Sequence, residues 1–108
     1  MNFTERESEI LRAICDYLAY KQHFFWRQNN TAIFDPGQGG GFRRMPKYGR
    51  KGTPDIFLLL PKRVIFLEVK SGQGYLSKEQ EELQNMCKQL DIEYYVVKSL
   101  DDVQKLGF

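Results

Sequence analysis

Two apolar segments joined by a two-residue connection constrain the fold of this chain more than any other feature. Residues 55–60 read Asp-Ile-Phe-Leu-Leu-Leu, and residues 63–70 read Arg-Val-Ile-Phe-Leu-Glu-Val-Lys. Both runs have the length and composition of buried strands, and only Pro61-Lys62 stands between them. Because antiparallel strands can be joined by so short a turn and parallel strands cannot, the sequence predicts a β-hairpin.

The register of this hairpin decides where its charged side chains lie. If the two connecting residues alone form the loop, Leu60 faces Arg63. Counting back along both strands then places Asp55 opposite Glu68. Lys70 projects from the same face as Glu68, two residues further on. A four-residue loop would leave both acids on one face, one diagonal step apart, whereas a slip of one residue would separate them.

This arrangement has a chemical and a structural interpretation. Like charges directly opposite each other destabilise a sheet, and a cation held between the two acids would remove that repulsion. Two carboxylates and an ammonium on one face, at a strand end, suit a divalent metal and a phosphate. The structural alternative is an ion pair of Lys70 with Asp55 or Glu68 at a sheet edge. The D…E-x-K spacing alone does not decide between them, because such spacings often arise by chance.

Length and composition indicate a single soluble globular domain spanning residues 1–108. The chain is 42% hydrophobic and 28% charged, and its longest apolar run, residues 56–60, is far too short to cross a bilayer. The first residues are acidic and polar, unlike a secretory signal. We expect Cys15 and Cys87 to be buried thiols in a reducing compartment. With His23 as the single histidine, the spacing of a zinc site is absent.

Positive charge is concentrated in residues 35–53, a glycine-rich stretch with five cations against one acid. Its net charge of +4 exceeds the +2 of the whole chain, so the remaining residues sum to −2. A loop of this length in a small domain is functional or disordered. Cations and aromatic rings on a flexible backbone favour contact with nucleic acid, and the alternative is a solvated loop that aids solubility. The cations are Arg43, Arg44, Lys47, Arg50 and Lys51.

Residues 4–20 have the spacing of an amphipathic helix, with apolar side chains recurring every three or four positions. Thr4 is the expected N-cap. At 100° per residue, Glu7 lies in the middle of the apolar stripe and Glu9 nearly opposite, so Glu7 is the acid directed at the interior. Its alternative role is to complete a capping box with Thr4, and the two roles are compatible.

A second helix is predicted from Ser77 to about Leu90, where Ser77 and Gln80 fit another capping box. Gln80 lies at the edge of the apolar stripe of this helix. It therefore either caps the helix or directs its amide at the site.

Three further elements complete the predicted order. Residues 24–29 have the composition of a strand, with Arg27 either on a polar edge face or in contact with phosphate. Residues 92–98 form another strand, and residues 100–106 form a last short helix after Ser99. The order α-β-β-β-α-β-α predicts an α/β fold.

The motif at 52–55 (Gly-Thr-Pro-Asp), the motif at 68–70 (Glu-Val-Lys) and the Ser-x-x-Gln helix start carry a resemblance to a known family. In this order they are similar to the VRR-NUC (virus-type replication-repair nuclease) domain of the PD-(D/E)xK nuclease superfamily. Residues 26–29 (Trp-Arg-Gln-Asn) add support, and the resemblance covers nearly the whole chain. It implies a PD-(D/E)xK-like αβββαβ(α) core with a mixed central sheet flanked by helices.

The resemblance also implies metal ligands. Asp55 and Glu68 would bind Mg²⁺ or Mn²⁺, hard cations that prefer oxygen ligands. The Val69 carbonyl would complete the inner shell, and Glu7 would bind the metal directly or through water.

The remaining implied roles concern the reaction and the substrate. Lys70 would orient the attacking water or stabilise charge growing on the phosphate. Gln80 would hydrogen-bond near the nucleophile or the DNA backbone. Arg27 and the cations of residues 35–53 would contact DNA.

Small members of the family resemble Holliday-junction resolvases in size and fold, which implies a metal-dependent, structure-selective DNA endonuclease acting on branched or junction DNA. Paired symmetric cuts need two sites related by a twofold axis, so a homodimer is implied. Such genes are frequent in phages and prophages, which implies the cytoplasm of a bacterial host or a phage-infected cell. The alternatives are a flap or nicking nuclease of the same fold, and a nucleic-acid-binding module that does not cut.

Overall fold

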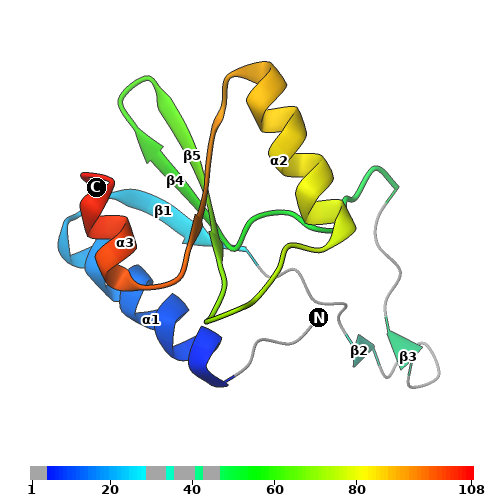
Figure 1. Cartoon of the computed structure of the whole chain (residues 1–108), viewed down its shortest axis with the longest axis horizontal. Helices are drawn as coiled ribbons and strands as arrows, with labels where there is room; N and C mark the ends of the chain where they lie inside the picture. The colour runs from blue at the N-terminus through cyan, green and yellow to red at the C-terminus, as the bar shows by residue number, and fades with distance from the viewer. Residues whose placement is uncertain (1–4, 29–33, 36–40, 43–46) are drawn as a thin grey trace.

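The computed structural model describes residues 5–28, 34–35, 41–42 and 47–108. These residues form three helices and six strands, arranged as shown in Figure 1. In chain order the elements are α1 (Glu5–Tyr20), β1 (Phe24–Arg27), β2 (Phe34–Asp35), β3 (Gly41–Phe42), β4 (Ile56–Leu60), β5 (Arg63–Val69), α2 (Lys78–Leu90), β6 (Glu93–Val97) and α3 (Leu100–Lys105).

The main sheet has four strands in the order β1-β4-β5-β6. Strands β1, β4 and β5 pair antiparallel, whereas β6 pairs parallel to β5, so the sheet is mixed. Helices lie on both of its faces, which confirms the predicted α/β fold with a mixed central sheet flanked by helices. None of the helices in the described part of the chain is long and apolar enough to span a membrane.

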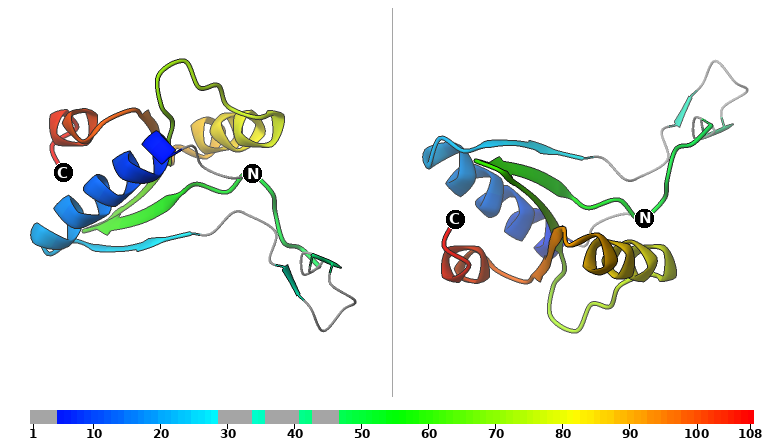
Figure 2. Two further views of the ribbon diagram at one scale, coloured as in Figure 1. Left: turned by 90° about the horizontal axis from the view of Figure 1, so that it is seen from below. Right: turned by 90° about the horizontal axis from the view of Figure 1, so that it is seen from above.

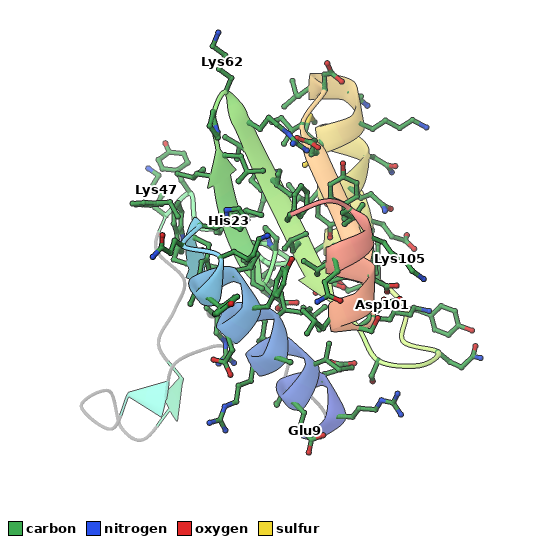
Figure 3. The ribbon with its side chains drawn as sticks, turned by 90° about the vertical axis from the view of Figure 1, so that its left-hand side faces the viewer. Glu9, His23, Lys47, Lys62, Asp101 and Lys105 are labelled. Atoms are coloured by element: carbon green, nitrogen blue, oxygen red, sulfur yellow. The ribbon has the colours of Figure 1, made fainter. Side chains whose placement is uncertain are left out.

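The register of the β4–β5 hairpin is the one predicted for a two-residue loop. Leu60 pairs with Arg63, and Ile56 pairs with Leu67 at the other end of the ladder. Lys62 takes a left-handed conformation in the turn, with φ at 59°, and it projects from the hairpin tip in Figure 3. The Asp55 amide donates to the Leu67 carbonyl at 3.0 Å, so the pairing continues past the strand end towards Glu68.

The hydrophobic core lies between the sheet and the pair α1 and α3. The α1 stripe supplies Leu11, Ile14 and Leu18, all fully buried. The inward residues of β4 and β5 alternate as expected for a strand with one covered face, and α3 adds Val103. Figure 2 shows α1 and α3 together on one side of the sheet.

Helix α2 lies on the opposite face, at one end of the sheet. It packs against β6 and stands apart from β1 and β4, as both views in Figure 2 show. Its start is fixed by the predicted capping box, because the Ser77 hydroxyl accepts from the Gln80 amide and the Gln80 side chain accepts from the Ser77 amide. Ser99 caps α3 in the same way, by accepting from the Asp102 amide.

Two predictions about the ends of elements need comment. Thr4, the expected cap of α1, lies outside the described residues. The stretch 35–53 was predicted as loop throughout, and this is wrong at two points, because it contains Asp35 at the end of β2 and the strand β3. The two short strands pair antiparallel, with Phe34 opposite Phe42. Strands of two residues are too short to show the alternation of apolar and polar residues by which strands are predicted from sequence.

The two ends of the chain segment between β1 and β4 are anchored to the main sheet and to α2. At one end the Gln28 amide donates to the Asp55 carbonyl at 2.7 Å. At the other end Gly52 lies against the first turn of α2, where an added Cβ would come within 2.8 Å of the Glu79 backbone. Gly52 also has φ at +77°, so this close approach requires glycine for two reasons.

Candidate active site

Buried polar side chains in the described part of the chain gather at one place, the end of the β4–β5 hairpin opposite its turn. The five residues come from four separate segments, and each side chain is at most 6% exposed. Burying polar and charged groups costs free energy unless they are paired or bind a ligand. They are Glu7 in α1, Asp55 before β4, Glu68 and Lys70 at the end of β5, and Gln80 in the first turn of α2.

Asp55 is held by the backbone of the neighbouring strand. Its Oδ2 accepts a hydrogen bond of 2.7 Å from the Val69 amide. Val69 itself points to the other face and is fully buried in the core, as its position between Glu68 and Lys70 predicts. The Asp55 carboxyl group is therefore fixed beside Glu68 by a residue that the core immobilises.

Glu68 has two partners on one oxygen and none on the other. Its Oε2 accepts from Gln80 Nε2 at 3.1 Å, and Lys70 Nζ lies 3.8 Å from the same oxygen. Its Oε1 is buried and has no hydrogen-bond partner in the described part of the chain. At 3.8 Å the contact with Lys70 is the ion pair of the structural alternative and is too long for a hydrogen bond, and it leaves Glu68 Oε1 without a partner in the described part of the chain.

The two carboxyl groups are electrostatically linked. Burial and then the charge of Asp55 raise the pKa of Glu68 to about 9, against the opposing charge of Lys70. Burial also raises the pKa of Asp55, although the hydrogen bond from the Val69 amide and the charge of Lys70 act in the opposite direction. Burial is the main cause of both shifts, because a charged carboxylate is disfavoured where it loses its contact with water.

Glu7 reaches this end of the sheet from α1. Its Oε1 accepts from the Ser71 hydroxyl at 3.2 Å and from the Ser71 amide at 3.4 Å. The charge of Glu7 contributes to the raised pKa values of Asp55 and Glu68, so Glu7 lies within electrostatic range of both carboxyl groups. Glu7 is thus the interior acid of the first helix, as the helical stripe predicts, and it is anchored on the residue that follows Lys70.

Gln80 serves both of the roles considered for it. Its side-chain oxygen accepts from the Ser77 amide at 2.7 Å and completes the capping box. Its side-chain nitrogen donates to Glu68. A single amide therefore ties the start of α2 to the carboxylate pair, and Gly52 packs against the same helical turn.

The donor chemistry of this cluster fits a hard divalent cation. Asp55 and Glu68 offer adjacent carboxylate oxygens, and the unpartnered Glu68 Oε1 is an acceptor that a cation could satisfy. Within the described residues no three acidic, histidine or cysteine side chains form a metal-binding group. The roles of Glu7 and of the Val69 carbonyl as ligands stay predictions, as do the catalytic roles of the other residues.

The predicted DNA-contacting residues are exposed, unlike the buried cluster, where the structure describes them. Arg27 is exposed on the edge strand β1, and Lys47, Arg50 and Lys51 are exposed in the segment that leads to Gly52. Figure 3 shows Lys47 on the side of the molecule that also carries the β2–β3 pair. Arg43 and Arg44 lie outside the described residues.

Two residues near the cluster were not anticipated from the sequence. Ser71 binds Glu7, and its position directly after the Glu-Val-Lys motif is a signal that could have singled it out. Tyr94 in β6 has a buried hydroxyl without a hydrogen-bond partner in the described part of the chain, and burial followed by the charge of Glu68 raises its pKa. No local pattern identifies Tyr94, because its position depends on the parallel pairing of β6 with β5.

The cysteines were expected to be buried thiols. Both are free, and Cys87 is buried whereas Cys15 is half-buried. Burial raises the pKa of each thiol.

Comparison with known proteins is consistent with this geometry. The family model described as the VRR-NUC domain matches residues 5–101. A solved structure described as a VRR_NUC domain superposes with a TM-score of 0.67 at 18% identity, covering 95% of each chain, which establishes the shared fold. A search of curated proteins gives no match. Since the family match spans most of the chain, from α1 into α3, the protein belongs to the VRR-NUC family and is a nuclease of the PD-(D/E)xK type.

Proposed function

We propose that this protein is a metal-dependent, structure-selective DNA endonuclease that cuts branched DNA in the manner of a Holliday-junction resolvase. The observation that carries the proposal is the convergence of two carboxyl groups, one ammonium and one amide in a buried cluster at the end of β4 and β5. Family membership supplies the reaction class, the cleavage of nucleic acid. The choice of DNA and of branched substrates is ours.

The carboxylates are proposed to hold the cation. Asp55 and Glu68 are buried carboxyl groups at neighbouring strand ends, and the pKa of Glu68 is raised to about 9, so a divalent cation that binds there would displace the Glu68 proton. Glu7 would add a carboxylate oxygen directly or through water, and the Val69 carbonyl would add a backbone oxygen. Mg²⁺ and Mn²⁺ suit this oxygen-rich set. A bound ion of this kind acidifies water and polarises a phosphodiester.

Lys70 is proposed to act on the attacking water or the phosphate, and Gln80 to orient Glu68. Lys70 is 2% exposed and lies beside Glu68, where its ammonium would orient the attacking water or stabilise negative charge growing on the phosphate. Gln80 holds the Glu68 carboxyl group through a hydrogen bond and so keeps its orientation fixed. A fixed orientation matters because small displacements of catalytic groups cost large factors in rate.

The substrate preference is proposed from charge and size. The segment that precedes Asp55 carries Lys47, Arg50 and Lys51 on exposed positions, where they would contact phosphates on either side of the cut. A chain of 108 residues offers one catalytic site. Symmetric cutting of a four-way junction needs two, so the active species is proposed to be a homodimer.

A cleavage assay tests the proposal. A four-way junction, a flap and a linear duplex are incubated side by side with the protein, with Mn²⁺, with Mg²⁺ and with a chelator. We expect metal-dependent cutting that is fastest on the junction and lost in Glu68→Gln, while Glu9→Gln, altered at an exposed acid, cuts like the parent.

Each other result has a distinct meaning. Fastest cutting of the flap, or single nicks in all three substrates, would replace the resolvase assignment with a flap or nicking nuclease. DNA binding without cutting under any metal would leave only a binding module. Equal cutting by Glu68→Gln and the parent would remove the carboxylate pair from the reaction.

A further inference from the structure

The face of the sheet that carries Asp55 and Glu68 also carries a group of aromatic rings. Residues at the same pleat position in adjacent strands form a row, with Trp26 opposite Phe57 and Phe57 opposite Phe66. The Trp26 and Phe57 rings are stacked with centroids 5.2 Å apart, and Phe57 meets Phe66 edge-on at 5.1 Å. We call the apolar residues on this part of the sheet the open face, and they are Phe24, Trp26, Phe57, Leu59, Val64 and Phe66.

The open face is left uncovered by the helices of the described chain. Helix α2 is the helix on this side of the sheet, and it packs against β6, away from β1 and β4 (Figure 2). As a result Phe24 is 68% exposed, Trp26 44% and Val64 47%. Their neighbours on the opposite side of the same strands, Leu58 and Ile65, are fully buried. The contrast shows that helices of the described chain cover one face of these strands and leave the other uncovered.

Helix α2 extends this apolar surface. On a helix, Met86 and Leu90 lie on one flank, and Gln84 and Lys88 lie on the other. The second flank lines a cavity with β6, so the first flank faces the open part of the sheet. Met86 and Leu90 are 47% and 61% exposed. Met86 and Leu90 therefore add two exposed apolar side chains on the same side of the sheet as the open face (Figure 2).

The size of this surface matches a protein interface. A free side chain of this kind presents about 150–200 Å². The five most exposed residues, at 44–68% exposure, therefore leave roughly 500 Å² of apolar surface on each chain. Pairing two such surfaces would bury about 1,000 Å², which is where specific interfaces begin.

The charges around the surface select its partner. The described residues of the open face are all uncharged, and Glu79 and Glu82 lie on the Met86 flank of α2, at its start. The rings of the open face therefore offer no cation to a polyanionic strand, whereas a second copy offers them a matching apolar surface. We propose that the open face, together with Met86 and Leu90, is the surface through which two copies of this chain form a twofold dimer.

The proposed dimer surface rests on the proposed function in one respect: paired cutting is the reason for two copies to associate. The row containing Trp26 and Phe57 lies one step along the strands from Asp55 and Glu68, so pairing through it would place two catalytic sites on one assembly. Whether the dimer forms can be measured without any cleavage, so the two proposals fail separately.

Sedimentation and fluorescence test the surface. Trp26 is the single tryptophan, so its emission reports on the open face directly. We expect the parent to sediment at about twice 12.7 kDa at tens of micromolar, and its emission to move to longer wavelength on dilution to the nanomolar range. Phe24→Glu places like charges across the twofold axis and should raise the dissociation constant at least about tenfold. Because Phe24 is largely exposed, the variant should keep the parent's urea midpoint in the nanomolar range, where both proteins are monomeric.

Tyr75→Glu is the matched control, since Tyr75 is an aromatic residue that is 83% exposed and lies outside the open face. It should remain dimeric. A parent that is monomeric at all concentrations would overturn the proposal, as would a Phe24→Glu variant that dimerises like the parent. Quenching of Trp26 by a single-stranded oligonucleotide in a monomeric protein would assign the surface to nucleic acid instead. Dimerisation as expected with no cutting of any DNA would retain the surface and reject the nuclease assignment.

Discussion

Replacing Glu68 by glutamine should remove most of the pH dependence of the metal-free protein's stability. The carboxyl group of Glu68 is buried beside Asp55, and these surroundings raise its pKa from 4.5 to about 9. Between these two values the folded protein keeps a proton that the unfolded chain releases. The stabilisation is therefore complete below pH 4.5 and is lost as the pH rises towards 9.

The expected size follows from the shift. Each unit of pH between 4.5 and 9 costs about 1.4 kcal/mol of the free energy of unfolding for one proton. From pH 6 to pH 8 the metal-free parent should lose about 3 kcal/mol. A glutamine side chain has no proton to lose. Glu68→Gln should therefore match the parent below pH 4.5 to within about 1 kcal/mol, and be more stable than the parent by about 2 kcal/mol at pH 6 and about 5 kcal/mol at pH 8.

Urea unfolding in the presence of a chelator, at pH 6 and pH 8, measures both effects. The matched control is Glu9→Gln, because Glu9 is an exposed acid of α1 and should leave the parent's pH dependence intact. A parent with equal stability at the two pH values would refute the reasoning. So would a Glu68→Gln variant whose stability falls with pH as steeply as that of the parent.

Three further predictions use the same cluster. Mn²⁺ at a hundred times its dissociation constant should stabilise the parent by about 3 kcal/mol, and its affinity should rise with pH because binding displaces a proton. Thermal unfolding at pH 6 and pH 8 measures both effects. An equal rise of the melting temperature in Glu68→Gln would contradict the site. Lys70→Met keeps the side-chain volume and removes the ammonium, so we expect DNA binding at the parent's affinity with cutting reduced at least about a hundredfold; a gel-shift and a cleavage time course decide this, and unchanged cutting would count against the role of Lys70. Gly52→Ala should cost about 2 kcal/mol or more in urea unfolding, because its Cβ would meet the α2 backbone at 2.8 Å, whereas Gly107→Ala has a positive φ but open space around it and should cost less; equal losses would refute the packing argument.

The parts of the fold that could be predicted were those set by local rules. The shortest loop at Pro61-Lys62 was one of the registers that the sequence allowed, and it is the one that places Asp55 near Glu68. The capping box of Ser77 and Gln80 is likewise readable from four consecutive residues. Both rules act over short sequence separations, so no knowledge of the tertiary structure is needed.

What could not be predicted depends on long-range pairing. The sequence shows that Glu7 faces inward, but its hydrogen bonds to Ser71 depend on how α1 crosses the end of the sheet. The exposure of Trp26 is a similar case, because strand composition does not reveal which face α2 leaves open. The proximity of Tyr94 to Glu68 follows from the parallel pairing of β6, whose partner strand precedes it by a whole helix.

Because the segment between β1 and β4 is anchored at both ends, changes within it can be made independently of changes at the acidic cluster. The hydrogen bond from Gln28 to Asp55 fixes where the segment leaves the sheet, and the contact of Gly52 with α2 fixes where it returns. Changes of length or charge between these two anchors should therefore place little strain on the acids, since lengthening a connection costs little free energy. Substrate preference can diverge among relatives in this way while the hydrolytic chemistry is inherited unchanged.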